Sequence, residues 1–128
     1  MSLKVVLAAG VDSYLLAAYN TVWRSAGYIV VPAISVREAI HHFMTGDFDL
    51  VLIGDSFSVE SKERLTRLIR ASGSRTPVVS IANSSGDRDL FADATIKNDS
   101  SKLLQRMGEL VAKESRSWAG QTIMFVYA

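Results

Sequence analysis

The chain of 128 residues alternates short apolar runs with longer amphipathic segments, and this alternation constrains its fold more than any other feature. Continuous apolar runs are typical of strands buried on both faces, and amphipathic segments between them are typical of helices that cover a parallel sheet. We therefore expect one α/β domain in which strands and helices alternate. The five expected strands are residues 4–9, 28–31, 48–53, 78–82 and 94–97.

Helix start and stop signals agree with this order. Ser35 and Glu38 have the S-x-x-E spacing of a capping box, and Gly27 stands where a residue just past a helix end often has a positive φ. Pro32 is expected to stop the second strand. Eleven residues separate the fourth strand from the fifth, so the helix between them should be reduced to a turn or two. The full-length helices are expected at about 12–26, 36–46, 59–71 and 99–114.

The expected helix at 59–71 carries the most basic stretch of the chain. Its apolar positions, Leu65, Leu68 and Ile69, should face the core. The basic residues are interleaved with Glu60 and Glu63 at helical spacing, which favours a solvated helix face over an anion or partner site. The basic residues of this stretch are Lys62, Arg64, Arg67, Arg70 and Arg75.

Composition excludes several classes of function. Fourteen basic and thirteen acidic residues give a formal charge of +1, which indicates neither a nucleic-acid surface nor an acidic-membrane binder. The absence of cysteine excludes disulfides, a thiolate zinc site and a Cys nucleophile. No apolar stretch approaches the ~20 residues that span a bilayer. His41 and His42 are neighbours on a helix and point about 100° apart, so they cannot share a metal on one face. We expect a soluble cytoplasmic protein.

Four segments, in their order and spacing, resemble the receiver domain of bacterial response regulators, the chemotaxis-type flavodoxin-like fold. They are GYIVVPAISVREAI (27–40), GDFDLVLIG (46–54), SRTPVVSIA (74–82) and ADATI followed by a capped helix (92–110). The resemblance implies a three-layer α/β domain around a five-stranded parallel sheet of order 2-1-3-4-5. It also implies chemistry at the carboxyl ends of the strands, where ligands of open α/β sheets bind.

A working receiver carries four kinds of group at those strand ends. An acidic pair after strand 1 holds Mg²⁺, an Asp ending strand 3 accepts the phosphoryl group, a Ser or Thr ends strand 4, and a Lys before a Pro ends strand 5. The metal and the cation offset the charge on the phosphoryl oxygens. The resemblance places these roles on residues that cannot perform them, so we expect no metal, no cofactor and no enzymatic activity. These degenerate positions are Ala9, Gly10, Gly54, Ala82 and Asn98.

Three residues near the degenerate positions are displaced candidates: Asp12, Asp55 and Lys97. Because side chains alternate between the faces of a strand, a shift of one residue normally turns a group away. At a strand end the chain can curl, and Gly54 would permit an unusual turn. Phosphorylation of Asp55 therefore stays open as an alternative, as does a small ligand bound in the strand-end crevice.

Residues 118–128 form an apolar extension to the domain of residues 1–117. Ile123, Phe125 and Tyr127 alternate with residues that are also apolar, so both faces of a strand there would be apolar. Left in water, such a segment is an aggregation hazard. We expect it to pack on the domain's own sheet edge or helix face, or to pair with another chain by strand addition and form a homodimer.

These observations predict a pseudo-receiver. Such a module would act in bacterial two-component, or phosphorelay, signalling through protein–protein interaction, with no nucleic-acid or membrane partner. The loss of charged groups at the strand ends favours this hypothesis, because Ala, Gly and Asn at those positions cannot hold a divalent metal.

Overall fold

The computed structural model describes residues 3–82, 91–97, 105, 108 and 109. Strands and helices alternate along the chain as expected, up to the end of the fourth strand. In order, they are β1 (Lys4–Ala9), α1 (Ser13–Ser25), β2 (Tyr28–Ala33), α2 (Val36–Thr45), β3 (Leu50–Ile53), α3 (Val59–Ala71), β4 (Val78–Ala82) and β5 (Ala94–Lys97).

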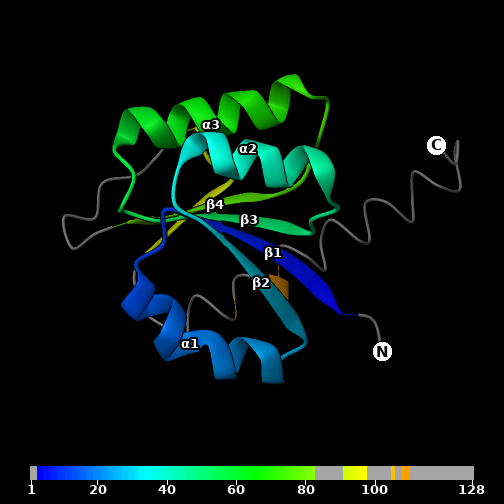
Figure 1. Cartoon of the computed structure of the whole chain (residues 1–128), viewed down its shortest axis with the longest axis vertical. Coiled ribbons are helices and arrows are strands. Elements are labelled where there is room, and N and C mark those ends of the chain that lie inside the picture. Colours follow the sequence, from blue (N-terminus) through cyan, green and yellow to red (C-terminus); the bar gives the residue numbers. More distant parts are fainter. Residues whose placement is uncertain (1–2, 83–90, 98–104, 106–107, 110–128) are drawn as a thin grey trace, which may run out of the picture.

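The five strands form one parallel sheet of order β2-β1-β3-β4-β5, which confirms the predicted flavodoxin-like topology. Helix α1 covers one face of the sheet, and α2 and α3 cover the other (Figure 1). The last residues of β2, β1 and β3 lie in register, since Ala9 at the end of β1 pairs with both Ala33 of β2 and Ile53 of β3. The predicted short fourth helix, the start of the last helix and the extension at 118–128 lie outside the described residues.

Each face of the sheet buries its own apolar cluster. On the α1 face, Trp23 is 1% exposed and packs with residues from the strands. On the other face, Ala39 of α2 and Leu65 and Ile69 of α3 are fully buried against the sheet. Strand side chains alternate between the two clusters, as period-2 geometry requires. The strand residues fully buried in the two clusters are Val6, Leu7, Ala8, Ala9, Leu50, Val51, Leu52, Ile53, Val78 and Val79.

The predicted end of the second strand was wrong. Strand β2 continues through Pro32 to Ala33, and Pro32 pairs in register with Ala8. Proline is compatible with an edge strand when its missing N–H would face away from the neighbouring strand. In α3 the predicted bounds are confirmed, but Leu68 is 39% exposed instead of buried.

The predicted capping box at the start of α2 and the predicted glycine after α1 are both present, but one hydrogen bond of the capping box has a different donor. The Glu38 amide donates to Ser35 Oγ at 3.0 Å, as a capping box requires. The Glu38 carboxylate accepts a hydrogen bond from the Ile34 amide at 2.6 Å, one residue before the cap. Gly27 has a φ of 92°, as expected past the end of α1.

No helix among the described residues combines the length and the apolar character needed to cross a bilayer.

Candidate functional site

Backbone hydrogen bonds join the loops that follow β1, β2 and β3 at the carboxyl edge of the sheet. The Gly10 amide donates to the Ala33 carbonyl at 2.9 Å, and the Gly54 amide donates to the Ala9 carbonyl at 2.9 Å. The Ser56 amide then donates to the Gly10 carbonyl, also at 2.9 Å. The β1–α1 loop is therefore bound directly to the first residues after β3.

This close approach leaves no room for a side chain at Gly54, the position that the resemblance assigns to a phosphoryl acceptor. A Cβ atom on Gly54 would lie 2.5 Å from the Gly10 carbonyl oxygen and 2.7 Å from the Val11 Cα. Both obstacles are backbone atoms, so a side-chain rotation cannot remove them. Any residue larger than glycine requires the two loops to move apart.

Gly10, one of the two positions for an acidic pair, is also covered. It has a φ of +66°, a conformation that favours glycine. A Cβ atom on Gly10 would lie 2.6 Å from Phe57 Cγ, because the Phe57 ring packs over this residue. The Phe57 ring therefore occupies space beside Gly10 at the strand-end crevice, where a small ligand would bind.

Two of the displaced candidates, Asp12 and Asp55, have separate partners. Asp12 is the N-cap of α1, and its Oδ1 accepts a hydrogen bond from the Tyr14 amide at 2.7 Å. Asp55 points instead to Lys62 of α3, with Oδ1 2.5 Å from Nζ. The side chain of the third candidate, Lys97, lies outside the described residues, as do the side chain of Ala82 and all of Asn98.

Lys62 is the functional-site residue that sequence reasoning misplaced. It was assigned to a solvated face, but its side chain is 2% exposed. Its ammonium donates to Asp55, to Ser80 Oγ at 3.1 Å and to the Ile81 carbonyl at 3.2 Å. Lys62 thus connects the loop after β3 to the end of β4.

The spacing of α3 contained a signal for this burial. Lys62, Leu65, Thr66 and Ile69 follow the i, i+3, i+4, i+7 pattern of one helix face, and all four are buried. A lysine in this pattern can bury its stem on the apolar face and carry its charge to a polar group beyond it. The charge of Lys62 favours surface exposure, whereas its helical spacing favours burial, and the structure follows the spacing.

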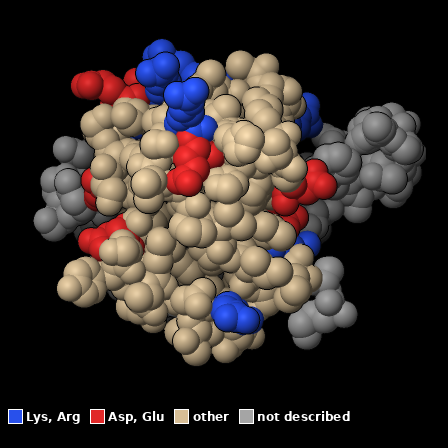
Figure 2. Space-filling view, in the orientation of Figure 1, with Lys and Arg blue, Asp and Glu red and all other residues tan. Residues whose placement is uncertain are grey.

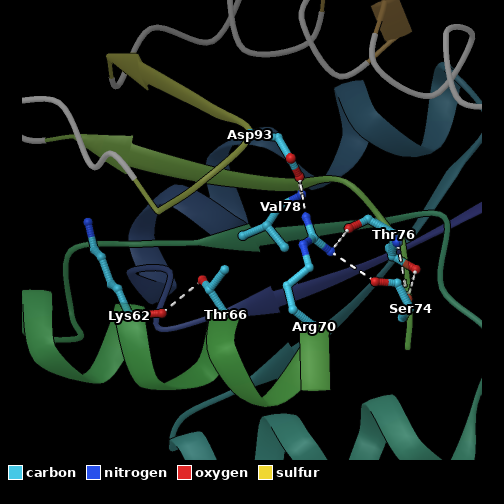
Figure 3. A network of polar contacts seen from close by, with 7 residues as sticks. All are labelled: Lys62, Thr66, Arg70, Ser74, Thr76, Val78 and Asp93. Atoms are coloured by element: carbon cyan, nitrogen blue, oxygen red, sulfur yellow. Dashed lines mark hydrogen bonds and ion pairs between the residues drawn. The ribbon is translucent and has the colours of Figure 1, made fainter. Parts of the chain in front are cut away.

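A second polar network joins α3 to the strands further along the helix (Figure 3). Arg70 donates to Asp93 Oδ2 at 2.5 Å and to the Thr76 carbonyl at 2.7 Å. The same Asp93 oxygen accepts a hydrogen bond from the Val78 amide at 2.7 Å. In Figure 3, Lys62 and Arg70 both extend from α3 toward the sheet, so α3 is fixed to it by two basic side chains.

The residues that the structure describes at the strand ends do not fit the Mg²⁺ ion that a receiver fold implies. A magnesium site needs oxygen ligands, usually carboxylates, and Ala9, Gly10 and Gly54 supply no side-chain oxygen. One Asp55 oxygen is already bound to the Lys62 ammonium. Within the described part of the chain, no three His, Asp or Glu side chains are grouped so that they could hold a metal.

Comparison with known proteins identifies the fold. No protein-family model matches the chain, and no curated protein matches its sequence. Solved receiver domains match over nearly their whole length. The receiver domain of the TMAO respiratory system response regulator TorR is 19% identical, with a TM-score of 0.75 over 86% of this chain and 98% of its own.

Two further structures give the same result. The receiver domain of the Francisella response regulator 1452 is 20% identical, with a TM-score of 0.73 over 87% of this chain and 98% of its own. The receiver domain of the sensor histidine kinase PA1611 from Pseudomonas aeruginosa PAO1, which has a magnesium ion in its active-site cleft, is 16% identical. Its TM-score is 0.73, over 87% of this chain and 99% of its own. The chain is thus a flavodoxin-like α/β domain, and more narrowly it has the fold of a response-regulator receiver domain.

Proposed function

We propose that this chain is a receiver-like module of bacterial, cytoplasmic two-component signalling that acts through contacts with other proteins and without a phosphoryl group. The receiver fold supports the signalling role. The observation that carries the absence of phosphate is at Gly54, where a Cβ would lie 2.5 Å from the Gly10 carbonyl oxygen. An acceptor carboxylate does not fit there while the loops keep this arrangement.

The charges around the strand ends support the same proposal. Phosphoryl transfer depends on positive charge, usually a metal ion, that neutralises the phosphoryl oxygens. Among the residues that the structure describes, Lys62 brings a positive charge to the strand ends. Its ammonium already donates hydrogen bonds to Asp55 Oδ1, Ser80 Oγ and the Ile81 carbonyl. We infer that Lys62 serves the chain's own structure and not an incoming phosphoryl group.

The test is a thermal melt with Mg²⁺ and beryllofluoride, a mimic of the phosphoryl group. We expect no change in Tm, whereas a ligand at 100 times its Kd would add about 2.7 kcal/mol to the free energy of unfolding. A receiver domain that coordinates magnesium, such as that of PA1611, serves as the positive control. A clear stabilisation of this chain would contradict the proposal.

One observation favours the alternative, a divergent receiver phosphorylated on Asp55. The Asp55 side chain is 38% exposed, and an ammonium lies beside it. The alternative predicts stabilisation by beryllofluoride that disappears in Asp55→Asn, and a mass increase of one phosphoryl group after incubation with acetyl phosphate. If the mimic stabilises the wild type and Asp55→Asn equally, it binds at a site other than Asp55. That result would contradict phosphorylation of Asp55 and also the proposal that the chain does not bind the mimic.

A further inference from the structure

Strand β2 is an edge strand of the sheet. Its hydrogen bonds to β1 show which of its backbone N–H and C=O groups point away from the sheet. The Lys4 amide donates to the Gly27 carbonyl and the Gly10 amide donates to the Ala33 carbonyl, both at 2.9 Å. In a parallel pair, alternate residues of a strand bond to the neighbouring strand. The odd-numbered residues from 27 to 33 therefore direct their backbone groups to β1.

The even-numbered residues direct their backbone groups to the open edge. Tyr28 and Val30 each present an N–H and a C=O there, and Pro32 presents a carbonyl but has no N–H. An added strand could therefore form a regular ladder with the first part of β2, and Pro32 would end it. Proline is one of the residues by which natural proteins limit the pairing of an edge strand with a further strand.

Apolar side chains border this edge on both faces of the sheet. Val30 lies on the α1 face, beside an open groove of about 290 Å³ lined by Asn20, Arg24, Ile29 and Val30. Ile29 is 44% exposed, and the next residue on its face, Val31, packs in the cluster under α2 and α3. The surface between α1 and α2 carries few charged side chains (Figure 2). A strand that fits this edge should carry apolar side chains on both faces.

We propose that residues 121–127 of this same chain occupy the β2 edge as an added strand. Their sequence, QTIMFVY, has no charge, and its apolar residues fall on both faces of a strand. This combination matches the edge, with one face packing toward Val30 and the other, which carries Ile123, Phe125 and Tyr127, packing toward Ile29. The proposal does not depend on whether the strand-end site accepts phosphate.

The path of the chain favours its own domain over a second copy. A Cβ atom on Gly108 would lie 3.7 Å from the Tyr28 hydroxyl, so Gly108 lies close to the end of the side chain of the first residue of β2. The last helix is expected to run to about residue 114, and its residues advance only about 1.5 Å each. The six residues from 115 to 120 can extend roughly 20 Å at about 3.3–3.6 Å each, which matches the ~20 Å length of β2. Such a tether holds the segment near the edge at millimolar effective concentration.

Paired cysteines test the proposal, because the natural chain has none. Ile29→Cys is combined in the full chain with Ile123→Cys, Phe125→Cys or Tyr127→Cys, and the products are oxidised. A disulfide forms only when the two Cβ atoms approach within about 3.5–4.5 Å. We expect at least one pair to give a cross-linked monomer. The matched control is Met44→Cys on α2, which is 55% exposed and should form no cross-link with the same partners.

The other outcomes contradict the proposal. A cross-linked dimer, together with a doubled mass in light scattering of the wild type, would assign the segment to a second copy. Absence of any cross-link, or equal cross-linking of the Met44→Cys control, would show that the segment does not occupy this edge.

Amide exchange in the full chain tests the pairing without cysteine. We expect the Tyr28 and Val30 amides to be protected in the wild type and to exchange at least about tenfold faster in Met124→Asp/Phe125→Asp. The Val31 amide, which faces β1, should not change. Equal exchange of Val30 in both proteins would overturn the proposal.

Discussion

Removing Asp55 should destabilise the chain more than removing Lys62, although the two side chains form one ion pair. The reason is their unequal burial, since Lys62 is 2% exposed and Asp55 is 38% exposed. Asp55→Ala removes the carboxylate from a buried ammonium, which keeps its hydrogen bonds to Ser80 Oγ and the Ile81 carbonyl. Lys62→Met leaves a carboxylate that water can already reach.

The magnitudes follow from these environments. Removing one partner of a buried ion pair costs about 3–5 kcal/mol, and because Lys62 keeps its other contacts we place Asp55→Ala at the lower end, about 3 kcal/mol. In Lys62→Met the new side chain fills the space of the lysine stem, so the loss is about 1 kcal/mol for hydrogen bonds to Ser80 and Ile81. The double variant should resemble Lys62→Met, which gives a coupling energy of about 3 kcal/mol between the two residues.

Urea unfolding of the four proteins measures these differences as shifts in midpoint at constant m-value. Glu63→Ala is the matched control, because Glu63 forms an exposed pair with Arg67 on the same helix and should cost about 0.5 kcal/mol or less. If Asp55→Ala costs no more than Lys62→Met, the ammonium is not held in the interior by Asp55. The reasoning about unequal burial would then be wrong.

Three further predictions concern other parts of the fold. Gly54→Ala should lower the free energy of unfolding by about 2 kcal/mol or more, because its Cβ would meet backbone. Gly46→Ala serves as the control, because its Cβ would lie 3.3 Å or more from its neighbours, and it should cost less than about 1 kcal/mol. Thermal melts of both variants measure the difference. Burial, and then the nearby Asp49, raise the pKa of Tyr28 above its ordinary value of 10.0. The folded state therefore favours the neutral phenol, and this stabilisation is complete below pH 10.0 and is lost as pH rises through the higher folded pKa. The urea midpoint of the wild type should fall more steeply above that pH than that of Tyr28→Phe, and parallel curves would contradict the assignment. Asp93→Ala should cost about 1–3 kcal/mol because it leaves the Val78 amide without its carboxylate, whereas Asp93→Asn keeps an acceptor and should cost less; equal losses in urea unfolding would exclude that hydrogen bond as the cause.

Elements with strong local signals were predictable from the sequence. The bounds of α3, β4 and β5 agree with the residue patterns, because amphipathic periodicity and continuous apolar runs are local properties. The end of β2 was not predictable in this way. Pro32 stops a central strand but not an edge strand, and the position of β2 in the sheet is a property of the whole topology.

The candidate site was predictable only in part. The resemblance placed Gly54 and Gly10 where a receiver has carboxylates, but the sequence does not reveal that the backbone of one loop lies against the other. That contact is tertiary, since the Ser56 amide binds the Gly10 carbonyl across 46 positions of the chain. Lys62 was misplaced because a long side chain can bury its stem while carrying a charge, so residue type alone does not determine its burial.

Lys62 and the missing carboxylates act against a metal ion in two separate ways. A divalent cation bound at Asp55 would lie a few ångströms from the Lys62 ammonium, and two unit charges 4 Å apart repel by about 4 kcal/mol at an effective dielectric constant of 20, about twice that for a divalent ion. Replacing Lys62 removes this repulsion but supplies no second carboxylate. Supplying one at Gly54 meets the Gly10 carbonyl at 2.5 Å. We therefore expect neither Lys62→Met nor Gly54→Asp alone to confer magnesium binding, as measured by calorimetric titration. Tight binding by Gly54→Asp would mean that the loops after β1 and β3 separate more easily than their hydrogen bonds indicate. Tight binding by Lys62→Met would mean that no second carboxylate is needed.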